Sequence, residues 1–158
     1  MNDKELKYKT NQVMFNLMKQ KGVIAPVDVL MGIGILSKTD YEHWRRGSID
    51  YLERVCKINL SKLSTVNREI RAFAKKNNLK ASWTHYNQWS SSKNKDKSAT
   101  PKQRYLNAQS THTQRELRFS KSGDENIERR YATHYIGNKM LDVIKERHAR
   151  AKNHNSEE

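Results

Sequence analysis

The chain contains only one cysteine, Cys56, in 158 residues. One thiol cannot form an internal disulfide, and it cannot build a cysteine-rich zinc site. This excludes small disulfide-stapled folds and favours a reducing compartment. Cys56 lies on the apolar side of its predicted helix, so we expect a small buried hydrophobe and not a nucleophile.

Recognisable cofactor and metal motifs are also missing. The six histidines show no spacing that is typical of a metal site. The segment Gly32–Gly34 lacks the spacing and the preceding strand of a dinucleotide-binding or phosphate-cradling loop. We therefore expect neither a bound metal nor a cofactor.

Long apolar runs are absent, and no stretch approaches the ~20 residues needed to span a bilayer. The first ten residues, MNDKELKYKT, are too polar for a signal peptide. We expect a cytoplasmic protein with no membrane partner. The Lys- and Asn-rich composition is typical of a low-GC bacterial or phage chain.

Large aliphatic residues are scarce and unevenly distributed. Leu, Ile, Val and Phe number 30, or 19% of the chain, and 18 of these lie between Val23 and Leu79. A share of about 20% marks the border of disordered chains. We predict a helical core domain over residues 1–89, a flexible basic linker over 90–114, a small ribbon and helix part over 115–152 that packs back on the core, and a disordered tail over 153–158.

Acidic residues are outnumbered, with 17 Asp and Glu against 31 Lys and Arg, for a net charge of +14. The electrostatic field of this positive charge attracts polyanions at long range, and each contact with a phosphate releases counterions. Nucleic acid is therefore the leading partner class, with duplex DNA favoured over RNA. The alternative partner is an acidic protein.

Apolar residues at helical spacing predict a helix over residues 4–20 and two short helices, joined by a glycine turn, over residues 26–46. The expected signals are Pro26 in a first turn, Ser37 as an N-cap, and Gly47 after the last turn. The short pair has the form of a helix-turn-helix, although any two packed helices need such a turn. The helix over 4–20 could instead join two copies of the chain in a homodimer.

The strongest helical pattern runs from Ser48 to about Lys76, as one helix or as two helices with Ser61 capping the second. The segment over 80–89 has the composition of a strand, which could pair with residues 116–120. A capping box predicts a helix over 126–136, and a last helix presents Leu141, Ile144 and His148. The predicted fold is mainly α, with a helix-turn-helix-like pair, a short β-ribbon and C-terminal helices.

A basic stripe distinguishes the second half of the long helical pattern. At 100° per residue, four polar side chains fall opposite Leu63, Val66, Ile70 and Phe73. Residues 62–80 hold six basic side chains and one acid, Glu69. We predict that this basic stripe and its flanking lysines bind nucleic acid together with three cations of the short helix pair. The predicted nucleic-acid-binding residues are Lys38, Arg45, Arg46, Lys62, Ser64, Arg68, Arg71, Lys75, Lys76 and Lys80.

The three tryptophans raise the question of base stacking. Trp44 shares a helix face with Tyr41, so we expect it in the core. Trp83 and Trp89 alternate with polar residues beside the basic linker, which makes them candidates for stacking on bases, although packing remains the preferred interpretation. They underlie an alternative function, binding of RNA or single strands.

A further alternative is an enzyme that acts on nucleic acid, such as a nuclease. Asp124, Glu125 and Glu128 could gather around Mg²⁺ with a histidine. Capping of the helix that begins there already explains two of these acids. We therefore assign no catalytic residue and expect a binding protein, for which a regulatory role is one option, more readily than an enzyme.

Overall fold

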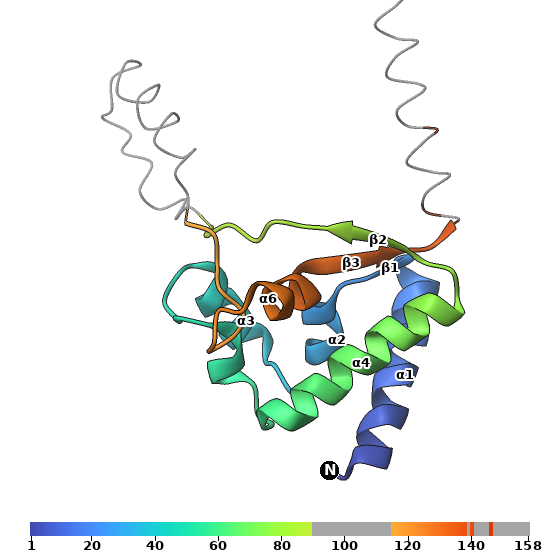
Figure 1. Cartoon of the computed structure of the whole chain (residues 1–158), viewed down its shortest axis with the longest axis horizontal. Helices are drawn as coiled ribbons and strands as arrows, with labels where there is room; N and C mark the ends of the chain where they lie inside the picture. The colour runs from blue at the N-terminus through green and yellow to red at the C-terminus, as the bar shows by residue number, and fades with distance from the viewer. Residues whose placement is uncertain (90–114, 139, 141–145, 147–158) are drawn as a thin grey trace, which may run out of the picture.

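The computed structural model describes residues 1–89, 115–138, 140 and 146. Figure 1 shows helices gathered beneath a small sheet. The elements are, in order, α1 (Asp3–Gln20), β1 (Val23–Ile24), α2 (Pro26–Ile33), α3 (Lys38–Arg45), the 3₁₀ helix η1 (Leu52–Val55), α4 (Leu60–Lys76), β2 (Lys80–Trp83), α6 (Glu125–Ala132) and β3 (Thr133–Ile136). The mainly α fold with a short antiparallel sheet is confirmed.

The first three helices begin and end where local chemistry predicts. Asn2 caps α1 by accepting a hydrogen bond from the amide of Glu5 at 2.8 Å. Pro26 occupies the first turn of α2, and Gly34, at φ +91°, ends that helix in the left-handed conformation. Ser37 caps α3 through the amide of Asp40 at 3.1 Å. The helix pair α2 and α3 is therefore present, joined by residues 34–37.

The long pattern over 48–76 forms two elements, η1 and α4. Asn59, and not Ser61, caps α4 by accepting from the amide of Lys62 at 2.9 Å. Upstream, the amides of Leu52 and Glu53 donate to the carbonyls of Arg118 and Phe119. These tertiary hydrogen bonds hold residues 52–55 in a short turn, which local periodicity could not reveal.

The sheet corrects the prediction for residues 126–136. Its order is β1-β3-β2, with both outer strands antiparallel to β3. The predicted helix ends at Ala132, and Thr133–Ile136 form the central strand. Pairing on both sides, together with a composition of β-branched and aromatic residues, overrides the helical pattern there.

Only a small part of the predicted ribbon is present. An antiparallel bridge joins Asn87 to Glu116, and the amide of Leu117 donates to the carbonyl of Tyr86 at 2.8 Å. The main partner of β2 is β3, with Trp83 opposite Thr133. The chain segment 80–88 thus runs from the sheet to residues 115–117, which places Trp83 between the two pairings.

Residues 1–89 and 115–138 share one hydrophobic core. The indole of Trp44 is fully buried, as predicted, with ring centroids 4.9 Å from Phe119 and 5.8 Å from Tyr86. Phe119 in turn stacks on Tyr131 at 5.5 Å. The predicted linker over 90–114, most of the predicted last helix and the tail lie outside the described residues, and the proposed division of the chain stays a prediction.

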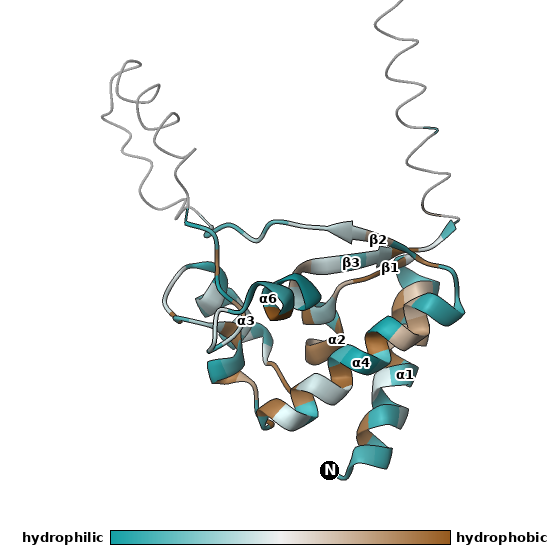
Figure 2. Cartoon of the chain, in the orientation of Figure 1, coloured by the Kyte–Doolittle hydropathy of each residue, from teal (hydrophilic) through white to brown (hydrophobic). Residues whose placement is uncertain are grey.

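The helices are amphipathic, as Figure 2 shows by alternating hydrophilic and hydrophobic bands along α4. Among the described residues, no helix combines the length and apolar character required to cross a bilayer.

Candidate nucleic-acid interface

Helix α4 presents the predicted basic stripe to solvent. Ser64, Arg68, Arg71 and Lys75 are all exposed, as are Lys76 at its end and Lys80 on β2. On the opposite face, Leu63, Val66 and Ile70 are at most 2% exposed. As the sequence predicts, one face of the helix packs against the core and the opposite face is exposed to solvent.

The stripe lacks acidic partners among the described residues. The ion pairs there join Lys21 to Asp28, Arg54 to Asp50, His85 to Glu116 and Arg129 to Glu125. Glu69, the acid within α4, accepts a hydrogen bond from the side-chain amide of Asn11 on α1 at 3.1 Å. In the part of the chain that the structure describes, the cations of the stripe therefore form no ion pair.

The positive surface continues from α4 to the sheet. Helix α4 ends at Lys76, and the exposed Lys80 begins β2, the strand that ends at Trp83. Trp83 lies opposite Thr133 of β3. Lys80 and Trp83 are therefore about 10 Å apart along one strand.

The cations of α3 form a separate group. Lys38 and Arg46 are exposed, but Arg45 is half-buried. Its guanidinium lies 5.0 Å from the ring centroid of Tyr86 and 4.9 Å from that of Trp89. Its Nε is buried without a hydrogen-bond partner in the described part of the chain. Arg45 is thus engaged within the fold.

Residues 86–89 also cover the C-terminal end of α3. The amide of Trp89 donates to the carbonyl of Arg45 at 2.7 Å, and Nε2 of Gln88 donates to the carbonyl of Arg46 at 3.0 Å. In Figure 1, α3 lies on the left and the C-terminal half of α4 on the right. The structure therefore does not bring the α3 cations together with those at the end of α4. Lys62, at the start of α4, donates to the carbonyl of Met1 at 2.6 Å.

Trp83 and Trp89 are more accessible than the packing interpretation predicts. Their side chains are 52% and 41% exposed, whereas Trp44 is fully buried. The guanidinium of Arg129 lies 4.7 Å from the Trp83 centroid, and the ring of His85 lies 4.8 Å from it. Each exposed indole thus combines a cationic neighbour with accessible aromatic surface.

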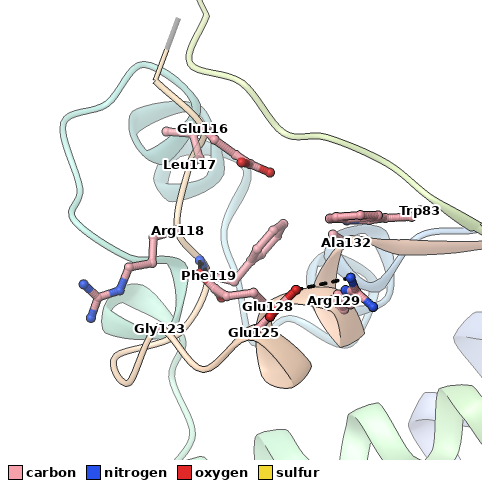
Figure 3. A pocket seen from close by; sticks show the side chains of 10 residues that line it. All are labelled: Trp83, Glu116, Leu117, Arg118, Phe119, Gly123, Glu125, Glu128, Arg129 and Ala132. Carbon is pink, nitrogen blue, oxygen red and sulfur yellow. Dashed lines mark hydrogen bonds and ion pairs between the residues drawn. The ribbon is translucent and has the colours of Figure 1, made fainter.

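A cavity of about 390 Å³ opens beside Trp83. Figure 3 shows Trp83 above Arg129, the ring of Phe119 at the centre, and Glu116 on the segment that carries Leu117 and Arg118. Sequence reasoning missed Glu116 and Arg129 as neighbours of Trp83, because they lie more than 30 positions away. The one available signal was the predicted pairing of 80–89 with 116–120.

The acidic cluster of the nuclease alternative has structural roles. Asp124 caps α6 through the amides of Asn126 and Ile127. The carboxylate of Glu128 accepts from the amides of Phe119 and Ser120 at 2.9–3.1 Å. Glu125 pairs with Arg129 at 3.2 Å. Within the described residues, no group of three His, Cys, Asp or Glu side chains is placed to hold a metal ion.

Helix α1 shows a surface that suits the predicted homodimer, without establishing it. Tyr8 and Phe15 are 65% and 55% exposed and lie two turns apart on one side of the helix. The homodimer stays a prediction.

Comparison with known proteins finds no matching family model, no matching curated sequence and no matching solved structure.

Proposed function

We propose that the protein binds nucleic acid, with duplex DNA as the preferred ligand, through the basic stripe on α4. The observation that carries this proposal is an exposed row of Arg68, Arg71 and Lys75 with no acidic partner among the described residues. Surfaces that serve solubility alone usually mix the two signs of charge.

The dimensions of the stripe suit a phosphate backbone. Seven residues separate Arg68 from Lys75, a rise of about 10 Å, which matches roughly three nucleotides at about 3.4 Å each. Lys76 and Lys80 extend the positive surface beyond the end of the helix. The net charge of +14 adds long-range attraction. The α3 cations are left out because Arg45 is held within the fold and because α3 lies away from the C-terminal half of α4 (Figure 1).

Binding of this kind depends steeply on salt. With three to five phosphate contacts, the affinity should fall roughly 40- to 500-fold between 50 and 200 mM salt. The same surface could bind an acidic protein. A flexible acidic chain, however, has no fixed spacing of charges that would match the regular spacing of the cations in the stripe. Salt dependence and a comparison of polyanions therefore separate the two partners.

A second candidate, binding of single strands or RNA, is favoured by the exposure of Trp83, at 52%. Stacking on an accessible indole contributes about 1–3 kcal/mol per base and tolerates any sequence. In that case the single strand would follow β2 and the stripe would hold its phosphates.

The test is a titration of the full chain with duplex DNA, single-stranded DNA, RNA and poly-glutamate, at matched charge and at several salt concentrations. We expect the duplex to bind most tightly, with log K falling by about 3 to 5 for each tenfold rise in salt. Equal binding to poly-glutamate would replace the proposal with an acidic protein partner. Tighter binding to single strands would favour the second candidate.

A further inference from the structure

The cavity beside Trp83 has the composition of a site for a flat, hydrogen-bond-donating ring. Its inner surface is apolar, because Leu117, Phe119 and Ala132 line it and each is at most 7% exposed. Its side wall is the indole of Trp83, with the guanidinium of Arg129 against it at 4.7 Å. Aromatic rings and guanidinium planes are the surfaces on which unpaired bases stack.

The rim of the cavity supplies acceptors. Glu116, Glu125 and Glu128 all line it. Glu128 is occupied by the amides of residues 119 and 120. Glu116 uses Oε1 toward Nδ1 of His85 at 3.2 Å, and Glu125 uses Oε1 toward Arg129. A carboxylate has about four lone-pair sites, so Glu116 and Glu125 retain capacity to accept further hydrogen bonds.

Carboxylates at the rim select among bases. They repel phosphate and accept from amino groups, as when Glu or Asp accepts from cytosine N4. Guanine offers two adjacent donors, N1–H and the N2 amino group, which match the two oxygens of one carboxylate. Thymine and uracil flank their single N–H donor with two carbonyl oxygens, which would face the negative charge. The cavity therefore favours guanine and disfavours thymine.

The cavity lies next to the basic stripe. Helix α4 ends at Lys76, and the exposed Lys80, which extends the positive surface, begins β2. Trp83 ends the same strand, three residues or about 10 Å further along. A nucleic acid whose phosphates contact α4 would thus bring a neighbouring unpaired base within reach of the cavity.

We infer that this cavity binds an unpaired nucleobase bearing an amino group, guanine best of all, while the stripe on α4 holds the flanking phosphates. The inference rests on the proposed function and names its substrate class, a duplex with an extruded or unpaired base. Glu116 is the specificity-determining residue and Trp83 is the stacking residue. In Figure 3 the carboxylate of Glu116 points into the space beside Trp83.

The test measures binding of the full chain to three duplexes that differ only in one position: fully paired, with a single unpaired guanosine, and with a single unpaired thymidine. For the parent we expect about tenfold tighter binding of the guanosine bulge than of the thymidine bulge. Glu116→Gln should bring that ratio within about twofold. Trp83→Leu should weaken both bulged duplexes about tenfold and leave the paired duplex unchanged.

The matched control is Glu5→Gln, an exposed acid on α1, which should behave like the parent. Trp83→Phe retains a stacking ring and should keep most of the binding. If the paired duplex binds but guanosine and thymidine bulges bind equally, the cavity inference is overturned and the proposed function stands. If no duplex binds, both are overturned.

Discussion

The hydroxyl of Tyr131 donates a hydrogen bond to Oε2 of Glu53 at 2.7 Å, although 78 positions separate the two residues. The other carboxylate oxygen of Glu53 accepts from the amide of Lys121 at 2.9 Å. One carboxylate on η1 thus holds two points of the segment 115–138. This contact, with the buried ring of Phe119, explains why residues far along the chain belong to the same core.

Tyr131→Phe should lower the free energy of unfolding by about 1.5–3 kcal/mol, because it removes a hydrogen bond to a charged acceptor while keeping the ring. Urea denaturation of parent and variant measures the difference. Tyr8→Phe is the matched control on an exposed tyrosine and should change stability by about 0.5 kcal/mol or less. Equal stability of the Tyr131→Phe variant and the parent would show that this contact does not stabilise the fold.

His134 makes stability depend on pH. Burial lowers the pKa of its imidazole, and Asp28 partly opposes that shift. Nε2 lies 2.5 Å from the hydroxyl of Tyr86, within hydrogen-bonding distance in the folded protein. Below the ordinary pKa of about 6.5, the unfolded chain binds the proton more readily, and stability is lost as the pH falls toward the folded pKa.

The measurement is the free energy of unfolding between pH 5 and 8 for the parent and for His134→Gln, whose amide oxygen can accept from Tyr86. The parent should lose more stability than the variant as the pH falls below about 6.5. Two parallel curves would contradict a coupling of His134 ionisation to folding.

Cys56 should react slowly in the folded protein. Burial, assisted by Glu53 and Asp40, raises the pKa of its thiol to about 12. Since the thiolate is the reactive form, labelling at pH 8 should be slower than for an unfolded chain by on the order of 10²- to 10³-fold. Labelling with an aromatic disulfide in buffer and in urea compares the two states. Similar rates in both would mean that the thiol is accessible.

Local chemistry predicted the start of α3, because the side chain of Ser37 lies within three residues of the amide it accepts from. The strand β3 could not be predicted in this way. Residues 133–136 follow a helix without a break, and they are extended because β1 and β2, which lie 50 or more positions away, pair with them on both sides. Pairing over such distances leaves no trace in local periodicity.

The candidate interface also contains residues that local periodicity predicts and residues that it does not. The basic stripe on α4 follows from a helical repeat, so Arg68, Arg71 and Lys75 could be placed on one face from the sequence alone. The internal engagement of Arg45 depends on the return of residues 86–89 over α3, and so could not be foreseen. The cavity beside Trp83 likewise needs Glu116 and Arg129 from separate segments.

Contact between the α4 stripe and phosphates should appear in the salt dependence of duplex binding. In the variant Arg68→Gln, Arg71→Gln, Lys75→Gln, three released counterions are lost, so the slope of log K against log salt should shrink by about 3. Stability should change by about 0.5 kcal/mol or less per site, because all three side chains are exposed.

The charge-matched control is Lys4→Gln, Lys7→Gln, Lys9→Gln on α1, where the three lysines are also exposed. It changes the net charge equally and should leave most of the slope intact. The measurement is therefore the salt slope for duplex DNA of the parent and the two triple variants. If the α4 stripe contacts phosphates, the slope falls by about 3 for the α4 variant alone. An unchanged slope for that variant, or the same loss in both variants, would show that the stripe does not contact the DNA.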